Sequence, residues 1–312
     1  RLTNSERGVT VGWERVVATH GAYDGLAHAL APLPPDSPVI HALPGFDITS
    51  PIRRAGHVPV GVRWSVEEPI ETLFERIELA VRMAGRLSGV VVNFPANPGG
   101  QSPTPRQWLD LLDLVDRTGV LLVVDDVYGF FEERPAEIYE HPRVILVESF
   151  SKRLGAPGLR LGAAICPLDL VPAVRASIAH STVGVARWLC EAGAAALRSY
   201  MDGGLREQVS QEVARRRREF RLHLQAKVNE SVVLGSDSLY ATVRLPPGIS
   251  PTVASEELVG LGLATTPGTA LLGEFADQEG NLGGFLRLCL GGTVEAAEAA
   301  DLLGEYLVAA QE

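Results

Sequence analysis

Uninterrupted runs of apolar, largely β-branched residues most constrain the fold of this chain. These runs and shorter strand-like segments occupy residues 16–19, 38–43, 58–62, 89–93, 120–124, 144–147 and 161–165. Helical patterns separate several of them, at residues 23–30, 48–56, 70–87 and 105–118. Strands that are apolar on both faces belong in a parallel sheet that helices cover on both sides. We therefore expect an α/β fold with a mostly parallel sheet, in a large domain over residues 1–205.

The pattern changes near Leu205. A long charged helix runs from there toward Asn229 and includes four consecutive arginines, residues 215–218, which we interpret as a solvated helix face. Strand and helix patterns then alternate at residues 239–245, 253–261, 285–290 and 293–307. We predict a smaller α+β domain over residues 206–312, joined through the long helix.

Charge and cysteine content narrow the functional classes. The chain of 312 residues has 28 basic and 38 acidic side chains, a net charge of −10, which argues against binding to nucleic acid or an anionic membrane. No apolar run approaches the roughly 20 residues of a membrane helix, and the opening residues form no signal-peptide pattern. Cys166, Cys190 and Cys289 are scattered and lack metal-ligand spacing. We expect reduced thiols, no metal site and a cytoplasmic location.

Lysine is scarce in this chain. Only two of the 28 basic residues are lysine, Lys152 and Lys227. Arginine can replace lysine as a point charge, but it keeps its proton and so cannot form an imine with an aldehyde. Lys152 follows a predicted strand and lies beside two serines, whereas Lys227 lies in a polar helix end. Lys152 is thus the candidate for covalent chemistry, and we interpret Lys227 as a surface charge.

Polar residues follow the predicted strands at their carboxyl ends, where parallel sheets bind ligands. Gly21, Ala22 and Tyr23 lie between the first strand and a helix. The free amides of such a turn suit a phosphate, although many strand-to-helix turns contain glycine for structural reasons. Ser149 and Arg160 lie on either side of Lys152 and add a hydroxyl and a cation. These residues predict an anion site.

A carboxylate ends one buried strand. Asp125 follows residues 120–124, and Tyr128 comes three positions later. A buried carboxylate is costly unless a cation pairs with it. The alternative is that Asp125 and Asp126 cap the next element.

These parts together match what pyridoxal 5′-phosphate requires of a protein. The turn and the arginine suit its phosphate, and the carboxylate suits its protonated ring nitrogen. A phenol and an asparagine suit its ring oxygen, and a lysine forms an imine with its aldehyde.

Five segments carry a resemblance to the class I/II aminotransferases, which are fold-type I pyridoxal-phosphate enzymes. Residues 19–26, Thr-His-Gly-Ala-Tyr-Asp-Gly-Leu, are similar to the phosphate-binding turn. Residues 93–100 resemble the Asn-Pro-Thr-Gly segment, and residues 124–128 resemble the Asp-Glu-x-Tyr segment. Residues 149–162, Ser-Phe-Ser-Lys-Arg-Leu-Gly-Ala-Pro-Gly-Leu-Arg-Leu-Gly, resemble the lysine motif. Residues 285–288 are similar to the C-terminal arginine strand.

The resemblance implies a role for each matching residue. Lys152 is the Schiff-base lysine and the proton shuttle, and Asp125 pairs with the pyridine nitrogen. Tyr128 and Asn97 bind the ring hydroxyl. Arg287, with Asn97, binds the substrate, and its guanidinium forks onto the α-carboxylate. The remaining cofactor contacts are the turn amides of Gly21, Ala22 and Tyr23, the phosphate ligands Ser149 and Arg160, and Phe46 stacked on the ring.

The resemblance also implies an aminotransferase that moves an amino group between an amino acid and a 2-oxo acid, working as a homodimer. The chain departs from the family in having Asn-Pro-Gly-Gly at residues 97–100 and Asp126 in place of glutamate. The family carries a longer segment before the phosphate turn, so we expect that the sequence either lacks its start or belongs to a shortened protein.

Two other functions stay open. One is a pyridoxal-phosphate-dependent lyase or cyclase on the same fold, because residues 91–100 resemble those of a capreomycidine synthase. The other is a non-catalytic, aminotransferase-like sensor domain of a regulator. For an aminotransferase we expect a neutral or basic amino-acid donor, since one arginine fork serves the α-carboxylate and no second arginine is evident for a side-chain carboxylate.

Overall fold

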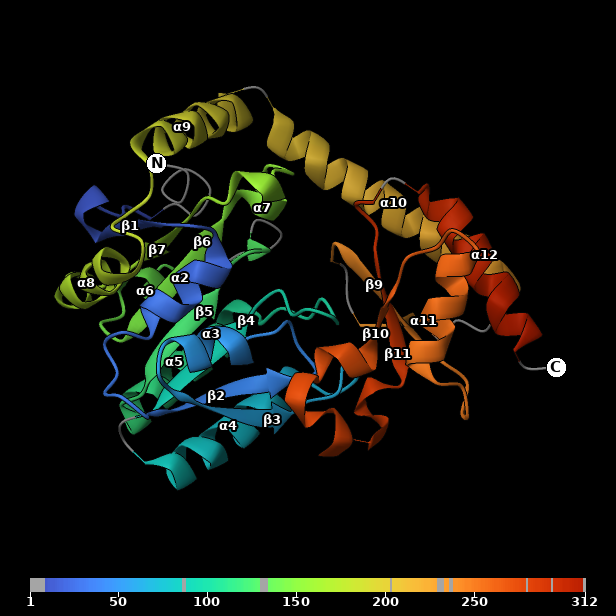
Figure 1. Ribbon diagram of the computed structural model, residues 1–312, viewed down its shortest axis with the longest axis horizontal. Helices are drawn as coiled ribbons and strands as arrows, with labels where there is room; N and C mark the ends of the chain where they lie inside the picture. The colour runs from blue at the N-terminus through green and yellow to red at the C-terminus, as the bar shows by residue number, and fades with distance from the viewer. Residues whose placement is uncertain are drawn as a thin grey trace.

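Two sheets, each packed with its own helices, form the fold (Figure 1). The computed structural model describes residues 9–85, 88–129, 134–202, 204–228, 233–235, 238–278, 280–292 and 294–310. The long helix α10 (Leu205–Lys227) connects the part of the chain that carries the larger sheet with the part that carries the smaller one.

The larger sheet is mostly parallel, as expected. Within the described residues it has seven strands, in the order β1-β7-β6-β5-β4-β2-β3. Strands β2 to β6 pair in parallel, and β7 is antiparallel to both its neighbours. The bounds are β1 (Val16–Thr19), β2 (Pro38–Leu43), β3 (Val58–Arg63), β4 (Gly89–Asn93), β5 (Leu121–Asp125), β6 (Val144–Ser149) and β7 (Gly162–Ile165).

Helices cover both faces of this sheet, which confirms the predicted α/β architecture. Leu73 and Trp108, from α4 and α5, are buried in the cluster on one face, and Leu26 and Ile52, from α2 and α3, in the cluster on the other. Local signals fix α5, because Thr104 forms a capping box with Gln107 and Gly119 ends the helix at a φ of 74°. The bounds are α2 (Ala22–Ala29), α3 (Thr49–Arg54), α4 (Ile70–Ala84), α5 (Pro105–Thr118), α6 (Glu137–Glu140), α7 (Phe150–Arg153), α8 (Val171–Ser181) and α9 (Arg187–Asp202).

The reversed strand β7 decides where the residues around Lys152 lie. The connection from β6 holds only the single turn of α7 and a short 3-10 helix, Pro157–Leu159, so it returns to the same edge of the sheet. Gly162 is in register with Ser149 on one side and with Thr19 on the other. The segment that includes Lys152 and Arg160 therefore begins and ends beside the turn that follows β1.

The smaller sheet is antiparallel, in the order β10-β11-β9-β8. Leu224 of α10, Leu258 of α11 and Leu303 of α12 are buried in the cluster that covers it, together with Leu286 of β11. The α+β expectation for this part is confirmed, whereas a domain boundary between residues 205 and 206 stays a prediction. The bounds are β8 (Val233–Leu234), β9 (Tyr240–Arg244), β10 (Thr266–Pro267), β11 (Phe285–Cys289), α11 (Pro251–Gly260) and α12 (Ala296–Ala309).

The arginine run of α10 is only partly the solvated face that was expected. Arg218 is exposed, but Arg216 donates to the carbonyl oxygen of Gly292 at 2.9 Å, and its side chain is 16% exposed. Lys227 lies farther along α10 and forms an ion pair of 2.8 Å with Glu305 of α12. Arg216 thus fastens α10 to the loop after β11, and the surface position of Lys227 agrees with its interpretation.

Two further features bear on the expectations for the thiols and for membrane helices. Cys166, Cys190 and Cys289 are all free thiols. Among the residues that the structure describes, no helix is both long and apolar enough to cross a bilayer.

Candidate active site

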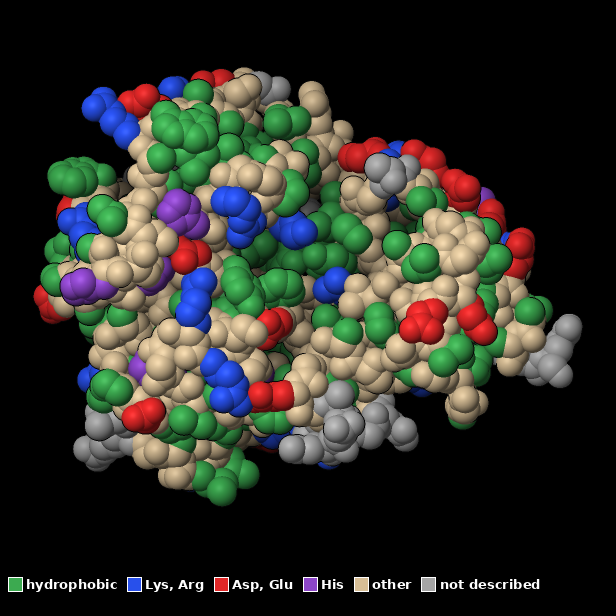
Figure 2. Space-filling model, viewed as in Figure 1, with side chains coloured by type: hydrophobic (Ala, Val, Ile, Leu, Met, Phe, Trp, Pro, Cys, Tyr) green, Lys and Arg blue, Asp and Glu red, His purple; other side chains and the backbone are tan. Residues whose placement is uncertain are grey.

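A cavity of about 290 Å³ lies where the carboxyl ends of the large sheet face the small sheet. Figure 2 shows a hollow between the two halves of the molecule, with Lys and Arg side chains at its centre. The lining includes nine residues predicted for the site: Ala22, Tyr23, Phe46, Asp125, Tyr128, Ser149, Lys152, Arg160 and Arg287. The sheet topology therefore brings together side chains from across most of the chain.

In the turn after β1, the backbone of Gly21 comes close to the guanidinium of Arg160. Gly21 precedes α2 with a φ of 83°, a conformation that L residues rarely adopt, and a Cβ there would lie 2.8 Å from Nη2 of Arg160. Arg160 donates to the carbonyl oxygen of His20 at 3.4 Å and to that of Pro157 at 3.0 Å. The first amides of α2 and the exposed guanidinium of Arg160 thus share one end of the cavity.

Two serines stand at the same end. The Ser149 hydroxyl accepts the amide of Ser151 at 3.1 Å and donates to the Ser151 hydroxyl at 2.9 Å. The O–H of Ser151 is thereby left to donate into the cavity that it lines. Amides, a hydroxyl and a guanidinium at one end are the donors that a phosphate group takes.

Asp125 and Asp126 point to opposite sides of the sheet, as successive strand residues do. Asp126 forms a fully buried ion pair of 2.7 Å with Arg134, whereas Asp125 lines the cavity. Burial raises the pKa of Asp125 to about 7, and the charge of Asp126 adds to this. Among the described residues, the one cap contact of Asp125 is long, with the Val127 amide donating to it across 3.4 Å, so capping does not explain this buried carboxyl.

Lys152 and Tyr128 lie on the walls of the cavity. Across the described part of the chain, the ammonium group of Lys152 has no hydrogen-bond or ion-pair partner. The hydroxyl of Tyr128 shares a hydrogen bond of 2.9 Å with that of Tyr240. Burial raises the pKa of Tyr128 well above its usual value, and Tyr240 raises it further.

Arg287 reaches the cavity from β11. Its Nη1 donates to Oδ1 of Asn97 at 2.8 Å, and its Nη2 donates to Oγ1 of Thr266 at 3.0 Å. Its guanidinium carbon lies 4.4 Å from the centre of the Tyr240 ring. Asn97 does not itself line the cavity, but it accepts a hydrogen bond from Arg287, which does. The backbone N–H of Asn97 donates to Oδ1 of Asn93 at 2.9 Å, which orients the loop after β4.

Phe46 and Tyr23 form one lip of the cavity. Phe46 is 44% exposed and meets the Tyr23 ring edge to face, with 5.9 Å between centroids. The Tyr23 hydroxyl donates to Asp47 at 2.8 Å. Phe46 is therefore placed at the mouth rather than in the core, as a ring-stacking side chain requires.

The residues present fit pyridoxal phosphate. Asp125 is buried without a cation at hydrogen-bond distance among the described residues, which is what raises its pKa. Nδ2 of Asn97 and Nε of Arg287 are buried and lack a hydrogen-bond partner in the same part of the chain. A protonated ring nitrogen would pair with the Asp125 carboxylate. Oxygen atoms of the cofactor or substrate would accept from Nδ2 of Asn97 and Nε of Arg287.

Sequence reasoning missed several residues here. Tyr240 and Thr266 lie on small-sheet strands, and no motif singles them out. Ser151 lies beside Lys152 in the sequence and also lines the cavity, a role that its position alone does not indicate. Its signal is the spacing in Ser-Phe-Ser-Lys, because a single turn of helix turns both hydroxyls to one side.

Comparison with known proteins identifies the family of the chain. Residues 2–302 match the family model described as aminotransferase class I and II. The chain therefore belongs to the class I and II aminotransferases, a family that uses pyridoxal phosphate. The resemblance drawn from the five segments is confirmed.

Individual relatives show how far the likeness extends. An aspartate aminotransferase of Thermococcus kodakarensis is 29% identical over 209 residues, 65% of this chain and 52% of that protein. A capreomycidine synthase of Streptomyces vinaceus is 36% identical over 104 residues, 30% of this chain and 25% of that protein. The chain thus spans about half the length of the first relative and a quarter of the second.

The fold also matches solved structures. A variant of the aspartate aminotransferase of Thermus thermophilus superposes with a TM-score of 0.81 at 23% identity, over 98% of this chain and 83% of that one. The aminotransferase fold is therefore confirmed over nearly the whole chain.

Proposed function

We propose that this protein is a pyridoxal-phosphate-dependent aminotransferase that moves an amino group between an amino acid and a 2-oxo acid. The observation that carries the proposal is the unpaired amine of Lys152 in one cavity with the buried carboxyl of Asp125 and the guanidinium of Arg287. When bound, the cofactor supplies an electron sink for the charge that develops at the substrate Cα.

The residues at one end of the cavity hold the phosphate. The amides of Gly21, Ala22 and Tyr23 would donate to it, because Ala22 and Tyr23 line the cavity beside Arg160 and Gly21 lies against that arginine; Ser149 holds the hydroxyl of Ser151 at the same end. Because these donors are fixed by the backbone and by one another, they anchor the cofactor while its other end reacts.

The residues at the other end hold protons. Asp125 would favour a protonated ring nitrogen, because a buried carboxylate is stabilised by a cationic partner and the described residues offer it none at hydrogen-bond distance. Tyr128, which lines the cavity, would donate to the ring oxygen, and Asn97, just behind the lining, has an Nδ2–H without a partner among the described residues that would add to it. Lys152 would hold the cofactor through its amine, and the same amine could then accept and return the proton at the substrate Cα.

Arg287 binds the substrate α-carboxylate. Its fork presents two parallel N–H donors, a geometry that lysine cannot supply. A single fork favours a neutral or basic donor over aspartate or glutamate. Arg217, Arg218 and Arg221 line a neighbouring cavity beyond Tyr240 rather than this one.

We also infer a homodimer. Helix α9 turns a largely uncovered face outward: Trp188 is 69% exposed, and Ala192, Ala194 and Ala195 are exposed on the same helix. Val183 in the loop before it is 89% exposed. An apolar helix face of this kind fits a second subunit. A cytoplasmic location, expected from the free thiols, stays a prediction.

The test is a spectral screen. The purified protein is loaded with the cofactor and mixed with single amino acids in a stopped-flow spectrometer. Conversion of the bound cofactor from its aldehyde to its amine form, fastest with a neutral or basic amino acid, supports the proposal. Fastest conversion with aspartate refutes the donor class.

The same screen addresses a second candidate function, a lyase or cyclase. The likeness to the capreomycidine synthase is what favours it. Release of ammonia or a cyclic product without the amine form of the cofactor would select this function instead.

A further inference from the structure

Tyr240 lies between Tyr128, which is proposed to bind the cofactor, and Arg287, which is proposed to bind the substrate. It begins β9, is buried, and lies opposite Cys289 in the register of β9 with β11. Its hydroxyl is 2.9 Å from that of Tyr128, on the large-sheet side. The centre of its ring is 4.4 Å from the guanidinium carbon of Arg287.

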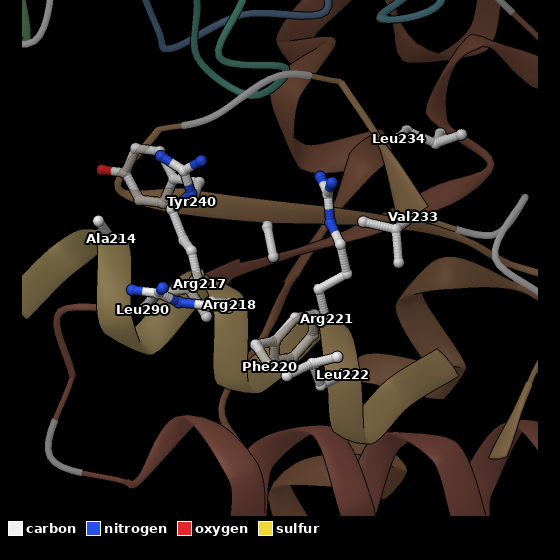
Figure 3. Close-up of a pocket in the computed structure, with 11 residues that line it drawn as sticks. Ala214, Arg217, Arg218, Phe220, Arg221, Leu222, Val233, Leu234, Tyr240 and Leu290 are labelled. Atoms are coloured by element: carbon white, nitrogen blue, oxygen red, sulfur yellow. The ribbon is translucent and has the colours of Figure 1, made fainter. Parts of the chain in front are cut away.

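The ring of Tyr240 makes a contact of its own, with Arg287, that does not involve its hydroxyl. It also lines a second cavity of about 390 Å³, together with Arg217 and Arg218 of α10. Figure 3 shows the hydroxyl at one end of this cavity, pointing away from Val233 and Leu234 at the other. The ring thus lies against the guanidinium of Arg287 and forms part of a cavity wall, while the hydroxyl makes its hydrogen bond with Tyr128.

A phenol has one proton to donate. If Tyr128 gives its proton to Tyr240, it can only accept at the ring oxygen of the cofactor, which is negatively charged and needs a donor. If Tyr240 gives its proton to Tyr128, the proton of Tyr128 stays available for that oxygen. Only the second arrangement gives a hydrogen-bond donor both to the Tyr128 oxygen and to the ring oxygen of the cofactor.

We propose that Tyr240 is a positioning residue: its hydroxyl donates to Tyr128 and so aims the Tyr128 proton at the cofactor, while its ring supports the guanidinium of Arg287. This proposal rests on the proposed function. The two roles of Tyr240 can be tested separately, since a phenylalanine at this position keeps the ring and removes only the hydroxyl.

The hydroxyl is tested by the absorbance of the bound cofactor as a function of pH. A donor at the ring oxygen stabilises its anion and lowers the pKa of the linkage to Lys152. We expect Tyr240→Phe to raise that pKa by roughly 0.3–1 unit, because the weakened donor is one neutral hydrogen bond. Asp125 and Arg287 are the charged groups that also act on Tyr128, and both remain in this variant.

A double-variant cycle shows whether Tyr240 acts through Tyr128. In a Tyr128→Phe background, Tyr240→Phe should cause no further shift. Tyr306→Phe is the matched control, because its hydroxyl bonds Glu257 on helix α11 and not the site. An unchanged pKa in Tyr240→Phe, or an equal shift in both backgrounds, overturns the proposal.

The ring is tested by kinetics. Tyr240→Phe should lower kcat with the donor KM unchanged, whereas Tyr240→Leu should also raise KM several-fold, because Arg287 loses the ring beneath it. Equal KM values in the two variants overturn this part. If the wild-type protein shows no cofactor absorbance at all, the proposed function fails first, and this proposal fails with it.

Discussion

Nη1 of Arg287 donates to Oδ1 of Asn97 across 2.8 Å, although the two residues are 190 positions apart in the sequence. The bond joins the loop after β4 to strand β11 and so crosses from the large sheet to the small one. Thr242 of β9 makes a second crossing, from its hydroxyl to the carbonyl oxygen of Pro98 at 2.8 Å. The loop around Asn97 is thus held by β9 and by β11, the strand that carries the arginine proposed to bind the substrate.

Arg287→Lys tests the fork directly. Lysine keeps the charge but loses the paired donors and the bond to Asn97, so we expect kcat/KM for the amino donor to fall by roughly 10- to 150-fold. Arg244→Lys is the control, because Arg244 lies on β9 but pairs with Glu67 at the surface. A loss in the control that equals the loss in Arg287→Lys would contradict the assignment.

Lys152 should carry the cofactor. We expect the purified, loaded protein to be yellow, and borohydride to fix the cofactor on Lys152, because its amine is the one that lies unpaired in the cavity. Peptide mapping by mass spectrometry locates the label. Lys227→Arg should label normally and Lys152→Arg should not, and a label on Lys227 would sink the assignment.

Asp125→Ala should keep the phosphate anchored but lose roughly two or more orders of magnitude in rate, since a buried charge partner is worth several kcal/mol. The rate is measured per folded molecule, with the folded fraction from circular dichroism. Asp126→Ala is the comparison: it breaks the buried pair with Arg134 and should cost about 3–5 kcal/mol of stability. A larger loss of rate in folded Asp126→Ala than in Asp125→Ala would show that the wrong aspartate is assigned.

Asp125 should make the cofactor-free protein less stable as pH rises. Its folded pKa of about 7 lies above the ordinary value of 3.8, so its contribution is complete below pH 4 and is lost as pH rises toward 7. Between pH 5 and pH 8 we expect the wild type to lose roughly 2–3 kcal/mol relative to Asp125→Asn. Urea unfolding at both pH values checks this, with Asp169→Asn, at an exposed position, as control. Parallel curves for wild type and Asp125→Asn would contradict the expectation.

The α9 face should hold the homodimer together. Trp188→Asp places a charge on an apolar, exposed surface, and we expect it to shift the protein from dimer to monomer in light scattering. Trp13→Asp is a comparison at another exposed tryptophan, 81% exposed and outside α9. A wild type that is monomeric and fully active would contradict the dimer itself.

Apolar runs and motif spacing predicted the large sheet and most of the cavity lining. The runs at 89–93 and 144–147 are buried strands, and Lys152, Asp125 and Arg160 meet as expected. The direction of β7 could not be predicted, because periodicity is the same in both directions along a strand. Helices α8 and α9 were missed, and the exposed alanines of α9 leave it without a clear polar face.

Tyr240 escaped sequence reasoning for a different reason. Its importance comes from two contacts, with Tyr128 and Arg287, that are 112 and 47 positions away in the chain. Such contacts are set by how the two sheets face each other, and strand patterns carry no information about that. The same holds for Arg216, whose carbonyl partners are fixed by the packing of α10 on α12.

The reversed strand β7 also determines where this protein can accept a change in length. Ser149 and Gly162 are locked in register, and a Cβ at Gly162 would lie 2.5 Å from the carbonyl oxygen of Glu148, so neither end of the segment can slide. Between them, Gly155 and Gly158 are exposed, with open space around their Cα atoms. Residues added at Gly155 would extend into open space and leave both strands undisturbed, whereas Pro157 lines the cavity and accepts from Arg160, so evolution can change the length of this segment before Pro157 while Lys152 keeps its position.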